Sequence, residues 1–185
     1  MKKIQVTRDW VLFLDRDGVI NERIPGEYIT DFNQFRFLDG VLEFLEKASG
    51  IFKYIILVTN QQGIGKGIMT ESELDLLHEC MIREVRRCRG KIDAIYYCGD
   101  KSTQSNNSRK PKTDMAYWAR EDFPDIDFMK SIMVGDSITD MDFGKRLEMQ
   151  TVLVGECLGY TDQDVLVDYV LEGLPDLLSV LECEK

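Results

Sequence analysis

Val11-Leu12-Phe13-Leu14-Asp15-Arg16-Asp17-Gly18 is the stretch that decides the fold class. Its four consecutive apolar residues predict a short strand that is buried on both faces, as strands of parallel sheets are. The aspartates and the glycine that follow predict a turn at the carboxyl end of this strand. Taken alone, that turn is as consistent with a solvated loop as with a functional site.

Apolar runs alternate with helical patterns along the rest of the chain. Further strands are predicted at 54–58, 92–97, 131–134, 151–154 and 169–171, and helices at 41–48, 70–89, 111–121, 138–147 and from about 175. Strands that alternate with helices imply βαβ crossovers and a mostly parallel sheet. We therefore expect an α/β fold, a Rossmann-like three-layer sandwich, in a single domain over 1–185 with no large cap domain.

The composition is that of a globular protein, with 185 residues, 44% hydrophobic and 30% charged. The net charge of -10 argues against nucleic acid or an anionic membrane as the main partner. No run approaches the ~20 apolar residues of a membrane span, and the N-terminus does not resemble a signal peptide. The five cysteines form no C-x-x-C pair, which favours reduced thiols. We expect a cytoplasmic monomer.

Polar residues follow four of the predicted strands. They are Asp15 and Asp17, then Thr59-Asn60-Gln61, then Arg109-Lys110 at the end of the polar loop 99–108, and finally Asp136-Ser137 with Asp140 one turn later. Ligands of open α/β sheets bind beyond the carboxyl ends of the strands. We therefore expect these side chains at one edge of the sheet.

This set of side chains suits phosphoryl transfer from a phosphate monoester. The substrate is a dianion, so a divalent cation must screen it from a carboxylate nucleophile. Asp15 and Asp136 offer the oxygen ligands that Mg²⁺ prefers. Lys110 can neutralise charge on the phosphoryl oxygens, while Thr59 and Asn60 can donate hydrogen bonds to them.

The four polar segments together resemble the haloacid-dehalogenase-like (HAD) phosphatases. Their order and spacing match over roughly residues 11–155. Within that superfamily the chain looks most like the family of heptose-bisphosphate 7-phosphatases and histidinol-phosphatases. The sequence segments that show this resemblance are Asp15 to Asn21, Tyr28, Thr59 to Gly67 and Tyr96-Tyr97-Cys98.

The resemblance implies Asp15 as the nucleophile that forms an aspartyl-phosphate and Asp17 as the general acid and base. It implies Mg²⁺ on Asp15, the Asp17 carbonyl and Asp136, and it places Thr59 and Lys110 on the transferring phosphoryl group. The substrate would be a small sugar phosphate. The residues expected to bind it are Asn21, Tyr28, Asn60, Gln61, Gln62, Lys66 and Arg109.

Two departures from the family pattern stand in the sequence. A zinc clip of Cys and His often precedes the Arg-Lys pair, but here only Cys98 is present, and zinc needs about four such ligands. We therefore expect no zinc. Ser137 stands where the family often has lysine, which removes a cation from the pocket.

Alternative interpretations remain open at this stage. The substrate could be histidinol phosphate or another small phosphomonoester, or the chain could be a receiver-like domain that carries a stable phospho-aspartate. Asp140 is as consistent with a helix N-terminal acid as with a role behind the metal ligands. His78 reads most simply as a packing or surface residue.

Overall fold

The fold is an α/β sandwich built on a parallel sheet, in a computed structural model that describes residues 3–24, 26–155 and 166–183. The six-stranded sheet has the order β4-β3-β2-β5-β6-β7, and every neighbouring pair is parallel. Its strands are β2 (Val11–Leu14), β3 (Tyr54–Asn60), β4 (Ala94–Cys98), β5 (Ser131–Gly135), β6 (Gln150–Val154) and β7 (Tyr169–Leu171). The expected fold class is confirmed.

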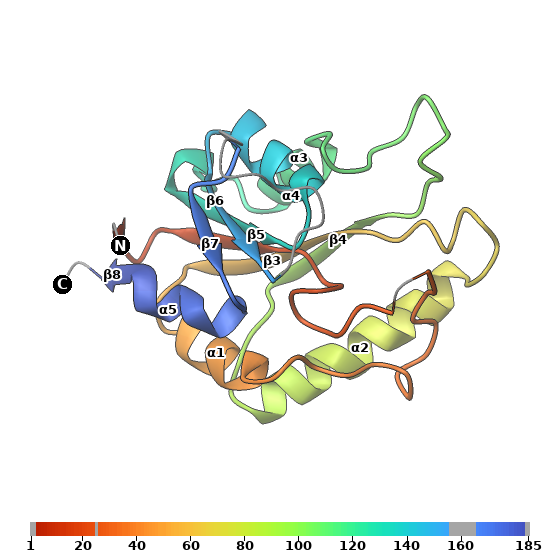
Figure 1. The fold of residues 1–185 in the computed structure, drawn as a ribbon, viewed down its shortest axis with the longest axis horizontal. Coiled ribbons are helices and arrows are strands. Elements are labelled where there is room, and N and C mark those ends of the chain that lie inside the picture. The colour runs from red at the N-terminus through yellow and green to blue at the C-terminus, as the bar shows by residue number, and fades with distance from the viewer. Residues whose placement is uncertain (1–2, 25, 156–165, 184–185) are drawn as a thin grey trace.

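Helices cover both faces of this sheet (Figure 1). On one face lie α1 (Val41–Ala48), α2 (Glu71–Arg87) and α5 (Leu177–Val180); on the other lie α3 (Asp114–Asp122) and α4 (Ile138–Arg146). The start of α2 is set by a capping box, in which Thr70 accepts from the Glu73 amide at 3.2 Å and Glu73 accepts from the Thr70 amide at 2.7 Å. Across the described ranges, no helix is long and apolar enough to span a bilayer.

The central strand β2 packs into two hydrophobic clusters. Leu12 and Leu14 belong to the cluster on the side of α1, α2 and α5, whereas Val11 and Phe13 belong to the cluster on the side of α3 and α4. All four side chains are completely buried. Burial of each contributes about 1.5–3 kcal/mol, so the end of β2 is held firmly, and with it Asp15.

The chain end departs from the sequence-based prediction. β1 (Ile4–Val6) and β8 (Leu181–Cys183) form a separate two-stranded parallel sheet that the sequence patterns did not predict. Three-residue strands are too short to show a period. The buried Leu174, Leu177 and Val180 are spaced like a helix, yet only a 3-10 turn (Leu174–Asp176) and the short α5 form before β8. Residue 157, one of the cysteines, lies outside the described residues.

The order of strands in the sheet reverses direction beside β2. β3 and β4 lie on one side of β2, and β5, β6 and β7 lie on the other. Such a switch point opens a crevice beyond the carboxyl ends of the two strands that flank it. Here those strands are β2 and β5, which end next to Asp15 and Asp136.

Candidate active site

Asp15 begins a tight turn at the end of β2. Its amide donates to the Val134 carbonyl of β5 at 3.0 Å, so the two strand ends stay joined at this point. The turn reaches Gly18, which has a φ of 86°, a left-handed value that favours glycine. A Cβ at Gly18 would lie 2.2 Å from Asp136 Oδ2. Glycine therefore lets the turn after β2 approach the carboxylate after β5.

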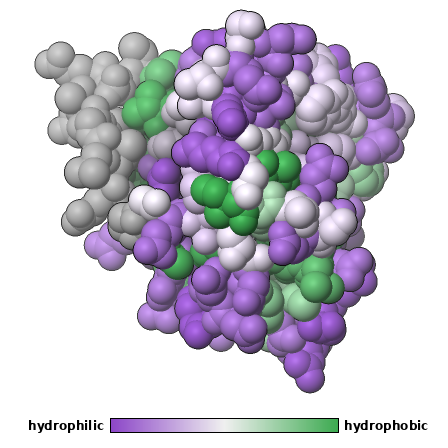
Figure 2. Space-filling model, turned by 90° about the vertical axis from the view of Figure 1, so that its right-hand side faces the viewer, coloured by the Kyte–Doolittle hydropathy of each residue, from purple (hydrophilic) through white to green (hydrophobic). Residues whose placement is uncertain are grey.

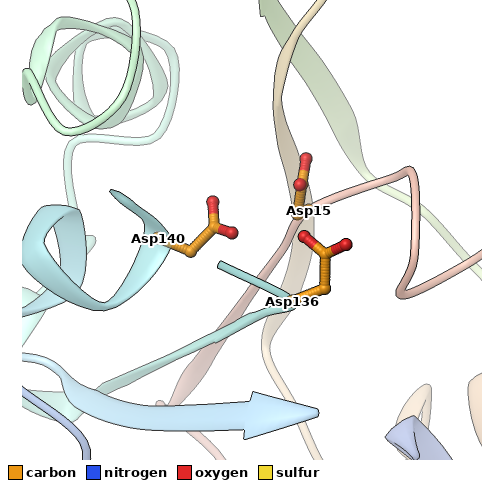
Figure 3. A group of neighbouring side chains, drawn as sticks. All are labelled: Asp15, Asp136 and Asp140. Atoms are coloured by element: carbon orange, nitrogen blue, oxygen red, sulfur yellow. The ribbon is translucent and has the colours of Figure 1, made fainter. Parts of the chain in front are cut away.

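Three carboxylates meet at this crevice. Asp15, Asp136 and Asp140 each offer an oxygen within 4.8 Å of the others, and Figure 3 shows them facing one another. Burial raises the pKa of Asp15 to about 7, helped by repulsion from Asp140 and Asp136 and opposed by Lys110. Burial and the Asp140 charge also raise the pKa of Asp136. These hard oxygen donors hold excess negative charge, which fits a divalent cation.

Lys110 lies against two of these carboxylates. Its Nζ is 2.9 Å from Asp15 Oδ1 and 2.6 Å from Asp140 Oδ1, and its side chain is only 1% exposed. Both contacts are salt bridges between a buried cation and a carboxylate. Burial alone would lower the pKa of Lys110, but Asp140 and Asp15 raise it overall, so the lysine stays charged.

Two further side chains contact this cluster. Arg23 Nη1 contacts Asp136 Oδ2 at 3.0 Å from an exposed position. The Asn60 carboxamide accepts from the Lys110 amide at 3.0 Å and donates to the Lys110 carbonyl at 3.3 Å. Asn60 therefore fixes the backbone that presents Lys110.

Asp140 caps a helix and also contacts the buried lysine. It accepts from the Ser137 amide at 3.2 Å and from the Ser137 hydroxyl at 2.5 Å, which caps the start of α4. Its other oxygen pairs with Lys110. One buried carboxylate thus connects the helix to the cation beside Asp15.

Asp17 points into a set of donors. Arg16 Nη2 lies 2.9 Å from both carboxylate oxygens, Asn21 Nδ2 donates at 3.0 Å and Gln61 Nε2 at 2.9 Å. Burial would raise the pKa of Asp17, but the Arg16 charge and these hydrogen bonds outweigh it and hold the pKa below the usual value. Asp17 is therefore ionised at neutral pH in this arrangement.

Gln61 and Asn21 hold the Asp17 carboxylate by hydrogen bonds. Gln61 also donates to Thr59 Oγ1 at 2.9 Å, so it links the ends of β2 and β3. Asn21 is fully buried and is not among the residues that line the cavity. In this structure Asn21, expected from the resemblance to bind substrate, instead contacts the Asp17 carboxylate.

A cavity of about 390 Å³ opens in front of the carboxylates. This volume suits a small ligand such as a sugar phosphate. The other expected substrate residues line it: Tyr28, Asn60, Gln61, Gln62, Lys66 and Arg109. Lys66 Nζ donates to the Tyr28 hydroxyl at 2.8 Å, and Arg109 Nη1 donates to the Asp100 carbonyl at 3.2 Å.

Two loops near the sheet edge differ in whether they line the cavity. Residues 23, 24 and 26–29 line it, whereas none of the residues 99–108 does, and that loop extends away from the sheet (Figure 1). The surface at the right-hand side of Figure 1 is largely hydrophilic around a small hydrophobic patch (Figure 2). At the start of the loop 99–108, the thiol of Cys98 at the end of β4 contacts Asp100 Oδ2 at 3.4 Å. The expected absence of zinc stays a prediction.

Sequence reasoning missed two residues of this site. Arg16 was part of the decisive stretch, but nothing in a local pattern shows that its guanidinium turns onto Asp17. Arg23 sits in a loop 113 residues from Asp136, and no sequence signal pairs them.

Comparisons with known proteins agree with this geometry. A family model described as HAD-hydrolase-like matches residues 107–177. The D-glycero-beta-D-manno-heptose-1,7-bisphosphate 7-phosphatase of Pasteurella multocida is 35% identical over 92% of this chain and 96% of its own. The D-glycero-alpha-D-manno-heptose-1,7-bisphosphate 7-phosphatase of Mycobacterium bovis is 37% identical over 75% of this chain and 73% of its own.

A solved structure shows the same fold. It is the D,D-heptose 1,7-bisphosphate phosphatase from B. bronchiseptica, complexed with magnesium and phosphate, with a TM-score of 0.81, 23% identity and coverage of 92% of this chain and 96% of that one. The relatives support a phosphatase over the receiver-like and histidinol-phosphatase alternatives. The chain therefore belongs to the HAD-like hydrolases, in the family of the heptose-1,7-bisphosphate 7-phosphatases.

Proposed function

We propose that this chain, acting as a single catalytic domain, removes the 7-phosphate of D-glycero-D-manno-heptose 1,7-bisphosphate. The observation that carries the proposal is the placement of Asp15, which stands at the end of β2 between a buried lysine and two further carboxylates. That arrangement supplies a nucleophile, a cation for the phosphoryl oxygens and oxygen ligands for a metal. The substrate follows from the relatives' names.

Asp15 and Asp136 are the side chains that would hold Mg²⁺, together with the Asp17 carbonyl. The raised pKa of both carboxyls reflects burial and the repulsion that a divalent cation would relieve. When bound, the ion supplies positive charge that screens the substrate dianion from the nucleophile. Asp140 stays behind the other two, because one of its oxygens already caps α4 and the other pairs with Lys110.

In the first step an Asp15 oxygen attacks phosphorus, the bond from phosphorus to the sugar oxygen breaks, and an aspartyl-phosphate forms. Lys110 and the Thr59 hydroxyl stabilise the charge on the phosphoryl oxygens. Asp17 gives its proton to the departing sugar oxygen. Asp17 is ionised before substrate arrives, but a phosphate dianion nearby raises a carboxyl pKa and so favours uptake of that proton.

In the second step Asp17, now ionised again, removes a proton from water. The water attacks the phosphorus of the aspartyl-phosphate, inorganic phosphate leaves, and Asp15 is regenerated. The donors around Asp17 favour its ionised form, which is the form this step needs.

The remainder of the substrate would occupy the cavity beside Tyr28, Gln62, Lys66 and Arg109. Lys66 and Arg109 bring positive charge to the lining of this cavity. A substrate with a second phosphate offers that charge a partner. The small volume of the cavity favours a compact sugar over a polymer.

A phosphate-release assay tests the proposed function. The panel contains both anomers of the heptose bisphosphate, the corresponding monophosphate and histidinol phosphate, each with Mg²⁺ and with a chelator. We expect Mg²⁺-dependent release that is at least ~10-fold more efficient on a bisphosphate than on either other compound, which is ~1.4 kcal/mol of transition-state binding. A singly phosphorylated substrate that wins by the same margin would contradict the substrate assignment.

A further inference from the structure

His78 is a buried polar residue that the proposed mechanism does not use. It lies in the middle of α2 and exposes only 5% of its surface. Its Nε2 lies 3.2 Å from Arg16 Nη1, although the two residues are 62 positions apart in the chain. A core histidine packed only for its shape would have no need of this contact.

The contact with Arg16 determines the protonation state and the tautomer of His78. Arginine is always charged and can only donate hydrogen bonds, so His78 Nε2 must accept and Nδ1 must carry the proton. A protonated His78 would set two cations against each other in a buried place. Burial and the Arg16 charge accordingly lower the pKa of His78 to about 3.

The surroundings of His78 show why a neutral acceptor is useful here. The charged groups that act on it are Arg16 and, on the far side of the guanidinium, Asp17. The Tyr97 ring of β4 packs nearby, at 6.2 Å between ring centroids. A carboxylate in place of His78 would form a second ion pair with Arg16 and weaken the pair with Asp17. A neutral imidazole accepts a hydrogen bond from the guanidinium without forming such an ion pair.

Arg16 has little freedom of its own. It is 1% exposed, and its Nε and Nη2 donate to Asp17 at 3.2 and 2.9 Å while Nη1 meets His78. Loss of the acceptor would leave a buried charged donor without a partner. The guanidinium would then turn, and its hydrogen bonds would no longer hold the Asp17 carboxylate in its present orientation.

We propose that His78 is a positioning residue for the reaction. Its Nε2 accepts from Arg16 and so aims the opposite edge of the guanidinium at the Asp17 carboxylate. This inference rests on the proposed function, because it assigns Asp17 the acid and base work. Mutation of side chains that orient groups of an active site in this way typically lowers activity by about 10–100-fold.

The kinetic test compares two variants of His78. His78→Leu keeps the bulk and removes the acceptor, whereas His78→Gln places an amide oxygen near the position of Nε2. With saturating Mg²⁺ and varied heptose bisphosphate, we expect His78→Leu to lower kcat by ~10-fold or more with little change in KM, and His78→Gln to recover most of that loss. Val85→Ala, another buried position of α2, controls for helix destabilisation and should lower Tm without this loss of kcat.

A spectroscopic test does not depend on activity. His78 is the single histidine of the sequence, so its ring nitrogens can be read by ¹⁵N NMR without assignment. We expect only the Nδ1–H tautomer in the wild type, and a change in the tautomer population in the Arg16→Met variant, which removes the donor. An Nε2–H tautomer, unchanged kcat in His78→Leu, or equal losses in the Leu and Gln variants would each overturn the inference. If the wild-type protein releases no phosphate, the proposed function fails, while the NMR result still decides the contact with Arg16.

Discussion

Lys110 and Asp140 form an ion pair in which both side chains are 1% exposed, with 2.6 Å between Nζ and Oδ1. Removing one partner of a buried pair costs about 3–5 kcal/mol, because the other charge is left without compensation. We therefore predict that Lys110→Met destabilises the protein by ~3 kcal/mol or more without metal. Mg²⁺ should restore part of this loss, since it supplies positive charge to the same carboxylates. Chemical denaturation with and without Mg²⁺ measures both effects.

Lys145→Met is the matched control for that experiment. Lys145 pairs with Asp168 at 2.6 Å, but both side chains are more than a quarter exposed. Pairs in contact with solvent contribute about 0–1 kcal/mol. Equal losses in the two variants, or no response of Lys110→Met to Mg²⁺, would contradict the assigned role of the buried pair.

Alanine variants of Gly18 and Gly67 can distinguish the effect of backbone strain from the effect of contact with the candidate active site. Both have positive φ, 86° and 71°, but a Cβ at Gly18 meets Asp136 Oδ2 whereas one at Gly67 meets nothing within 4 Å. Each alanine variant should lose about 1–2 kcal/mol of stability to the left-handed backbone. Only Gly18→Ala should also weaken Mg²⁺ binding, because it displaces a proposed ligand. Calorimetric titration with Mg²⁺ gives the answer, and equal affinities in the two variants would argue against Asp136 as a ligand.

The pH dependence of stability reports on His78. Its pKa is lowered from 6.5 to about 3 on folding, so between these values the unfolded chain binds more protons than the folded one. Stability contributed by the neutral imidazole is therefore complete above pH 6.5 and declines as the pH falls towards 3. The decline amounts to about 2 kcal/mol by roughly pH 5.

His78→Gln removes this titration and serves as the reference. Denaturation of both proteins from about pH 8 to 5 isolates the His78 contribution, because the other acidic groups cancel in the difference. We expect the wild type to lose ~2 kcal/mol relative to the variant over this range. Parallel pH curves would show that His78 titrates normally and faces solvent.

The sequence allowed the sheet and the edge that carries the site to be predicted. Buried parallel strands such as Val11–Leu14 show as continuous apolar runs, and the polar residues after them must meet at the carboxyl edge. Asp15, Asp136 and Lys110 could therefore be expected near one another from their positions after predicted strands. These contacts follow from backbone topology.

Other features depend on side-chain directions over long separations. The contacts of Arg16 with His78 and of Arg23 with Asp136 join residues 62 and 113 positions apart, and a different rotamer would break either. The same is true of Asn21, whose amide turns inward onto Asp17 where the motif suggested substrate contact. The pairing of β1 with β8 joins two three-residue strands from opposite chain ends, which carry no periodic signal.

The covalent intermediate on Asp15 is the central claim, and its location can be measured directly. The aspartyl-phosphate forms in every cycle, so an acid quench of the wild-type enzyme during turnover with Mg²⁺ and heptose bisphosphate should trap the phosphoryl group on the enzyme. Peptide mass spectrometry is then expected to find it on Asp15, and to find none in the Asp15→Asn variant. A phosphoryl group on another residue, or phosphate release by Asp15→Asn at the wild-type rate, would contradict the account.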